Sequence, residues 1–95
     1  MASFEKVGYI GVDSGQVMLI DPCYIKNDFE SEFKAKPGLN YAGACEVTLS
    51  SEGYGNFGGV EMAFATRTAH GDGVYPVYVK RDANGTILEM KIKFA

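Results

Sequence analysis

Short segments in which apolar and polar residues alternate dominate this chain. The clearest lies near the C-terminus, where Leu88, Met90, Ile92 and Phe94 alternate with Glu89, Lys91 and Lys93. A period of two indicates a strand with one buried and one solvated face. Alternating or continuously apolar segments of strand length occur six times. They cover residues 6–12, 16–20, 41–50, 60–65, 74–81 and 88–94.

Turn residues separate most of these segments. Asp13-Ser14-Gly15 and Asp82-Ala83-Asn84-Gly85 predict tight hairpin turns, the second with Asn84 and Gly85 at positive φ. The continuous apolar run over 16–20 predicts a strand buried on both faces. Pro76 lacks the amide donor that a central strand needs, so it predicts an edge position or a bulge for 74–81.

One segment departs from the strand pattern. Asn27 or Asp28 could cap a helix, and Phe29 and Phe33 are four residues apart and so would share one helical face. We therefore predict an all-β fold: a compact antiparallel six-stranded sandwich or barrel with one short helical segment near 27–35. A sandwich is the first choice, and the length of 95 residues predicts a single domain over 1–95.

Composition and charge exclude several classes of function for this protein. The net charge is −3 and the nine Lys and Arg residues are scattered, which argues against binding duplex nucleic acid but leaves room for a small anionic ligand. No apolar stretch approaches the roughly 20 residues that span a bilayer, and the N-terminus does not resemble a signal peptide. We expect a cytoplasmic protein without membrane contact, in which Cys23 and Cys45 are small, buried thiols.

No motif for catalysis is present. His70 is the single histidine, and neither a nucleophile elbow nor a metal-ligand spacing accompanies it. We therefore expect no enzymatic activity, no metal and no cofactor. The glycine-rich segments 53–59 and Gly71-Asp72-Gly73 expose backbone amides that could hold an anion, although turn geometry alone explains them equally well.

Cations and aromatic residues near these loops suggest a ligand site. Arg67, Lys80 and Arg81 could neutralise phosphate. Tyr24 and Tyr75 could stack on a base, and Asp72 could accept from a ribose hydroxyl. The candidate ligand-binding residues are Asp72, Tyr75, Tyr24, Arg67, His70, Asp21, Lys80 and Arg81.

Two stretches carry a resemblance to a known group. Asp21-Pro22-Cys23-Tyr24 and the segment 71–78, Gly-Asp-Gly-Val-Tyr-Pro-Val-Tyr, resemble small uncharacterised bacteriophage and bacterial proteins similar to a domain-of-unknown-function family. The resemblance extends over most of the chain. Ala69-His70 stands where the pattern often has glycine or an aromatic residue, so the resemblance implies no role for His70. It implies a phage origin rather than an activity; phages use such proteins as accessories, inhibitors and sponges for nucleotide immune signals.

Three functions compete on these grounds. The first is a non-catalytic binder of a small anionic ligand, such as a phage sponge that sequesters a cyclic or ADP-ribose-type nucleotide. The second is a protein-interaction or accessory structural module, in which a strand edge pairs with a partner. The third and least favoured is a small hydrolase or metal enzyme. A homodimer is compatible with the first two, because two copies can build a pocket that one small domain cannot enclose.

Overall fold

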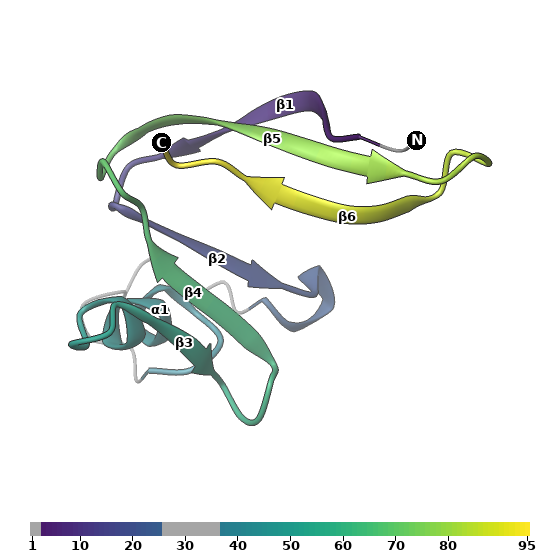
Figure 1. The fold of residues 1–95 in the computed structure, drawn as a ribbon. Coiled ribbons are helices and arrows are strands. Elements are labelled where there is room, and N and C mark those ends of the chain that lie inside the picture. The colour runs from purple at the N-terminus through teal and green to yellow at the C-terminus, as the bar shows by residue number, and fades with distance from the viewer. Residues whose placement is uncertain (1–2, 26–36) are drawn as a thin grey trace. The chain divides into compact units, whose positions relative to one another are not determined.

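The computed structural model describes residues 3–25 and 37–95, which form two compact units. One unit joins the segments 1–15 and 68–95, and the other comprises 16–67. Each unit contains one three-stranded antiparallel sheet (Figure 1). The predicted helical segment near 27–35 lies outside the described residues.

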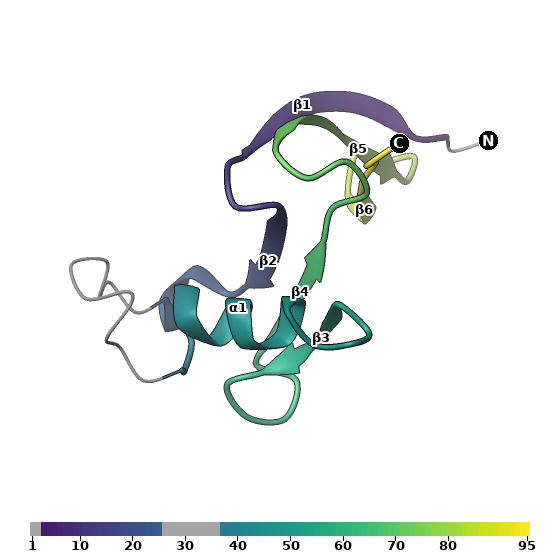
Figure 2. The same cartoon turned by 90° about the vertical axis from the view of Figure 1, so that its left-hand side faces the viewer.

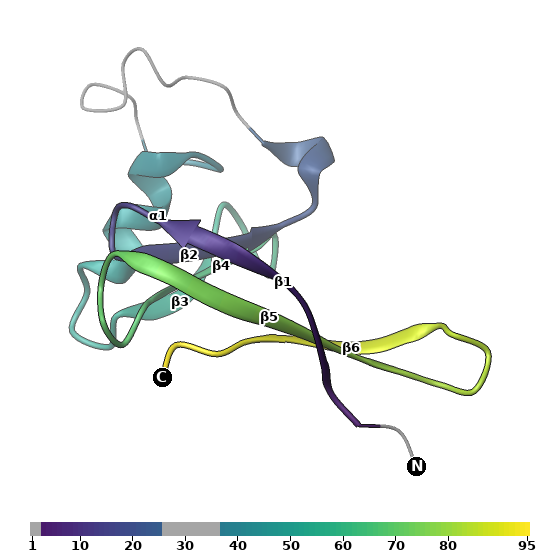
Figure 3. The ribbon, with the colours of Figure 1, turned by 90° about the horizontal axis from the view of Figure 1, so that it is seen from above.

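The first unit is built on the sheet β1-β5-β6, in which β5 is central (Figure 3). Its strands are β1 (Glu5–Val12), β5 (Gly73–Arg81) and β6 (Ile87–Ile92). The turn between β5 and β6 forms as predicted, but only Gly85 has a positive φ, +85°, while Asn84 does not. A single left-handed glycine after the turn is typical of the longer hairpin loops that end in a bulge, and the β5–β6 register shifts next to Arg81.

The position of Pro76 corrects the prediction of an edge strand. Pro76 lies in the central strand β5, opposite Tyr9 of β1. On its other side its carbonyl accepts from the Lys93 amide at 3.1 Å, one residue past the end of β6. The donor that Pro76 lacks is therefore missing where the β5–β6 ladder ends, so a proline is tolerated in a central strand here.

The buried side chains of this sheet lie on the face that carries Tyr75 and Val79. The ring of Tyr75 meets that of Phe94 edge to face, with centroids 5.4 Å apart. The side chains are more exposed in β6, where Leu88 is 56% and Met90 53% exposed. The alternation in β6 is real, but the apolar face that it predicted to be half-buried is largely open.

The second unit packs one helix against the sheet β2-β4-β3 (Figure 2). Its elements are β2 (Gln16–Ile20), the 3-10 turn η1 (Pro22–Tyr24), α1 (Tyr41–Thr48), β3 (Tyr54–Phe57) and β4 (Ala63–Arg67). β2 is an edge strand in which Val17 is buried, Met18 and Ile20 are half-buried and Leu19 is exposed, so the apolar run is not buried throughout as predicted.

The helix α1 occupies most of a segment predicted as a strand, and that prediction was wrong. Asn40 caps the helix: its side-chain oxygen accepts from the amides of Gly43 at 2.9 Å and Gly38 at 3.1 Å. The buried residues Gly43, Ala44 and Thr48 recur at helical spacing. Asparagine as a cap before an alanine-containing segment outweighs the short β-like alternation.

β4 also begins later than the predicted segment 60–65. The strand starts at Ala63, and Val60 lies in the preceding loop with 88% of its surface exposed. Ala63 and Ala65 are buried, whereas Phe64 points to the exposed side. A Cβ added to Gly55, which pairs with Ala65, would lie 3.5 Å from the side chain of Val47, so α1 covers the face with the small residues.

β3 arises within the glycine-rich segment predicted as a loop, because β4 supplies its hydrogen-bonding partner. The predicted all-β class is confirmed: residues 3–25 and 37–95 form six strands in two antiparallel sheets and one short α-helix. Neither sheet closes into a barrel over the described ranges.

Candidate functional site

The loop between β4 and β5 holds its shape through its own hydrogen bonds. The carbonyl of Gly71 accepts from the hydroxyls of Thr68 at 2.5 Å and Tyr75 at 2.7 Å. Gly71 has a φ of +71°, which a residue with a side chain rarely adopts. His70 and Asp72, on either side of Gly71 in the chain, are exposed. These hydrogen bonds and the positive φ explain Gly71 as a turn residue, and of the predicted ligand residues in this loop His70 and Asp72 are exposed.

Tyr75 is a structural residue of this loop. Only 6% of its surface is exposed, its hydroxyl is bound to Gly71, and its ring packs on Phe94. A base could stack on Tyr75 only after this packing was broken. The buried position therefore argues against the predicted stacking role.

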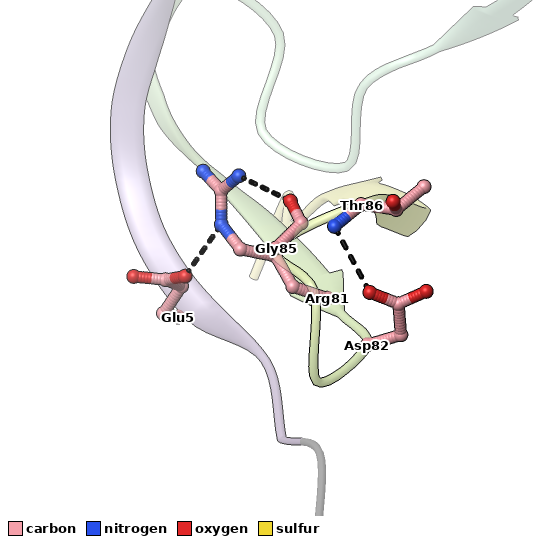
Figure 4. Close-up of polar contacts among 5 residues, drawn as sticks. All are labelled: Glu5, Arg81, Asp82, Gly85 and Thr86. Atoms are coloured by element: carbon pink, nitrogen blue, oxygen red, sulfur yellow. Dashed lines mark hydrogen bonds and ion pairs between the residues drawn. The ribbon is translucent and has the colours of Figure 1, made fainter.

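Arg81 and Lys80 already have acidic partners. The guanidinium of Arg81 lies between the carboxylate of Glu5, at 2.9 Å, and the carbonyl of Gly85, at 3.1 Å (Figure 4). Lys80 forms an ion pair with Glu89 at 3.3 Å. These cations hold the β5–β6 hairpin and the start of β1. They are at the opposite end of β5 from Tyr75, about 20 Å away at the usual rise per strand residue.

The remaining candidates lie in the second unit. Asp21 caps η1, where its carboxylate accepts from the Cys23 amide at 3.0 Å, and Tyr24 ends the same turn with an exposed ring. Arg67 ends β4, and its guanidinium donates to the Ser51 carbonyl at 3.5 Å. Cys23 is exposed and Cys45 half-buried, so the expectation of two buried thiols was wrong. Neither unit brings all of its predicted site residues together.

A cluster that sequence reasoning missed lies on the other face of β1-β5-β6. We call it the lysine–aromatic face and define it by Lys6, Tyr9, Tyr78, Lys91 and Lys93. Register places Lys6, Tyr78 and Lys91 in one row across the three strands. The next row contains Tyr9, Pro76 and Lys93. Directly opposite residues share one side of a sheet, so all five side chains point the same way.

A bulge in β1 makes this arrangement possible. Lys6 and Tyr9 are three residues apart, which in a regular strand would place them on opposite faces. The extra residue Val7 shifts the register between Lys6 and Gly8 and returns both side chains to one face. A hydrogen bond to Tyr9 and then the charge interaction with Tyr9 raise the pKa of Lys6 above its ordinary value. Desolvation opposes them, and the charge interaction with Tyr78 adds least.

Cation–ring contacts order the same face. The ammonium of Lys6 lies 5.2 Å from the ring centroid of Tyr9. That of Lys91 lies 4.1 Å from the ring of Phe4 and 5.4 Å from that of Tyr78. Within the described ranges, no carboxylate forms an ion pair with Lys6, Lys91 or Lys93. The charges of Lys6 and Lys91 are thus held near rings, and all three charges remain available to an anion.

An open hollow of about 390 Å³ adjoins this face. Its lining includes Pro76, Tyr78 and Lys93, and also Val74, the predicted candidate Tyr75 and the C-terminal residues Phe94 and Ala95. This volume falls in the range of small-molecule sites. A smaller hollow of about 90 Å³ lies in the second unit beside Gly43 and Phe57.

The charge of the chain is distributed unevenly between the units. The segments 1–15 and 68–95 contain five Lys or Arg and five Asp or Glu, and 16–67 contains four and seven. The unit with the lysine–aromatic face is therefore neutral, and the acidity of the protein lies in the other. The overall charge concealed this local group of cations.

Two further features bear on the class of protein. Over residues 3–25 and 37–95, no group of three or more His, Cys, Asp or Glu is placed to hold a metal ion. In the same ranges, no helix is long and apolar enough to cross a membrane.

Comparison with known proteins gives a family. Neither a curated protein nor a solved structure matches the chain. A family described as "Protein of unknown function (DUF4241)" matches residues 4–92. The match includes both sheets and the helix α1. Because it covers nearly the whole sequence, the chain belongs to the DUF4241 family.

Proposed function

We propose that this protein is a non-catalytic binder of a small anionic ligand and that the lysine–aromatic face is its binding surface. The observation that most supports this proposal is a hollow of ligand size that adjoins this face and is lined by both Lys93 and Tyr78. A cation beside an accessible ring suits a ligand that combines phosphate with a flat base. The proposed ligand is a nucleotide of the cyclic or ADP-ribose type.

The two rows of side chains assign roles to individual residues. Lys93 and Lys6 neutralise phosphate from the two edge strands, and Tyr78 on the central strand presents its ring between them. Pro76 forms a rigid apolar floor beside Tyr78. Asp72 and His70, exposed in the loop that precedes β5, remain candidates for contacts to a ribose.

The proposed biological role rests on the phage origin that the sequence resemblance implies. On the resemblance to phage proteins, we propose that the protein sequesters a nucleotide signal of host immunity in the host cytoplasm. A protein that sequesters a nucleotide needs only high affinity for that nucleotide and a high concentration in the cell. A rigid sheet face without a nucleophile–base pair is adequate for that task.

A calorimetric titration with cyclic nucleotides and ADP-ribose tests the proposal. The double variant Lys6→Ala/Lys93→Ala removes two cations of the lysine–aromatic face. It should weaken binding by roughly ten- to a hundredfold, as expected for the loss of charge-assisted hydrogen bonds. The control Arg67→Ala/Arg81→Ala removes the same charge from residues outside this face, which already contact Ser51 and Glu5, and should bind normally.

Two results would overturn this assignment. Absence of heat with every nucleotide would refute the ligand class. Loss of binding in the Arg67/Arg81 variant alone would move the site away from the lysine–aromatic face. The alternative function, a protein-interaction module, is favoured by one observation: the open apolar edge strand β6.

A further inference from the structure

The outer edge of β6 offers unpaired backbone groups. Within the part of the chain that the structure describes, β6 pairs only with β5. The bond from the Lys93 amide to the Pro76 carbonyl identifies that pair as the hydrogen-bonded type. In an antiparallel ladder such pairs alternate with non-bonded ones, so the amides and carbonyls of Met90 and Ile92 point away from β5. Another strand could add at this edge.

The side chains of β6 also lack cover. Every residue from Ile87 to Lys91 is exposed, and Leu88 and Met90 each expose more than half of their surface. Isolated apolar residues at a surface are ordinary, but an apolar edge strand with free amides is a template for pairing. The charged residues Glu89 and Lys91 alternate with the apolar ones. They limit which strand, and which register, this edge can accept.

A second copy of β6 satisfies these limits in one register. We propose that two copies of this chain pair antiparallel through β6, with Met90 opposite Met90 on the twofold axis. The outward backbone groups of Met90 then bond each other. Glu89 of each copy lies opposite Lys91 of the other, which gives two opposite-charge pairs on the same face of the sheet.

Each neighbouring register brings like charges together. Backbone groups that point outward must face each other, so the next possible twofold axes pass through residue 89 or residue 91. The first places Glu89 opposite Glu89. The second places Lys91 opposite Lys91, although it also pairs Glu89 with Lys93. Among these registers, only the Met90 register gives opposite-charge pairs without a like-charge pair, so the sequence of β6 favours it.

The paired edge would join both copies into one sheet of six strands. A twofold axis perpendicular to the sheet leaves the two lysine–aromatic faces on the same side. Lys91 belongs to both the lysine–aromatic face and this edge, but the pairing needs no ligand and is therefore tested on the unliganded protein.

Sedimentation of the unliganded protein over a range of concentrations tests the pairing. We expect a reversible dimer. Lys91→Glu should weaken it by about tenfold or more, because both cross-strand pairs become like-charged. Glu89→Lys should do the same, and the combined swap Glu89→Lys/Lys91→Glu should restore the dimer. Recovery in the combined swap also shows that the single variants still fold.

A matched control and a cross-link fix the register. Lys93→Glu changes the net charge as Lys91→Glu does, but residue 93 lies opposite Ile87 of the other copy, so the dimer should persist.

In protein with Cys23→Ser and Cys45→Ser, Met90→Cys should form an intermolecular disulfide, since paired Cα atoms lie about 5.5 Å apart. Glu89→Cys should not. A monomer at every concentration, a dimer indifferent to Lys91→Glu, or cross-linking through Glu89→Cys alone would overturn the proposal.

Discussion

Substitution of Tyr75 by phenylalanine separates a structural role from a ligand role. The hydroxyl of Tyr75 donates to the Gly71 carbonyl at 2.7 Å, and Thr68 donates to the same oxygen at 2.5 Å. Removal of one donor leaves this carbonyl with the other. The loss is therefore that of a single neutral hydrogen bond, about 1 kcal/mol. For a chain of this length, that free energy lowers the melting temperature by roughly 4–8 °C.

Urea unfolding of Tyr75→Phe should show a lower midpoint with an unchanged slope. The ring and its edge contact with Phe94 remain, so nucleotide binding should equal that of the wild type. Tyr75→Ala should cost about 3–5 kcal/mol, because the buried ring is lost as well. Tyr78→Phe, on the lysine–aromatic face, serves as the control and should change stability by less than about 0.5 kcal/mol. Unchanged stability with lost binding in Tyr75→Phe would refute the structural role.

Three other substitutions test individual contacts. Asn40→Ala removes the helix cap that bonds the Gly43 amide and should cost about 1 kcal/mol, measured by urea unfolding followed by circular dichroism. Asp82→Ala removes the carboxylate that accepts two amides of the hairpin turn and should lower stability by about 1 kcal/mol in the same assay, without loss of the fold. Tyr9→Phe should lower the pKa of Lys6 toward its ordinary value of 10.5 in an NMR titration, since the largest cause of the raised pKa is lost. The stabilisation from Lys6 is present below that value and disappears as pH rises through the folded-state pKa.

The parts of the fold that local pattern controls were predictable. Alternation and turn residues located β1, β2, β5, β6 and the hairpin turn at Gly85. They failed at α1, where a period-two pattern occurs by chance in a segment that Asn40 caps as a helix. They also failed at β3, whose strand conformation depends on pairing with β4 rather than on its own composition.

The candidate site was less predictable, for a physical reason. Alternation places Tyr75 and Tyr78 on opposite faces of their strand, but it does not indicate that the face of Tyr75 is the buried one. Lys6 and Lys91 are 85 positions apart and meet Tyr78 only through register. The bulge at Val7, which returns Lys6 to the face of Tyr9, leaves no signal that alternation can detect.

Amide chemical shifts recorded during a nucleotide titration test the central claim most directly. If the lysine–aromatic face binds the ligand, the largest changes should fall in residues 6–9, 74–78 and 91–95. Changes confined to residues 21–24, 68–72 or 80–81 would contradict the account and return the site to the residues that the sequence first suggested.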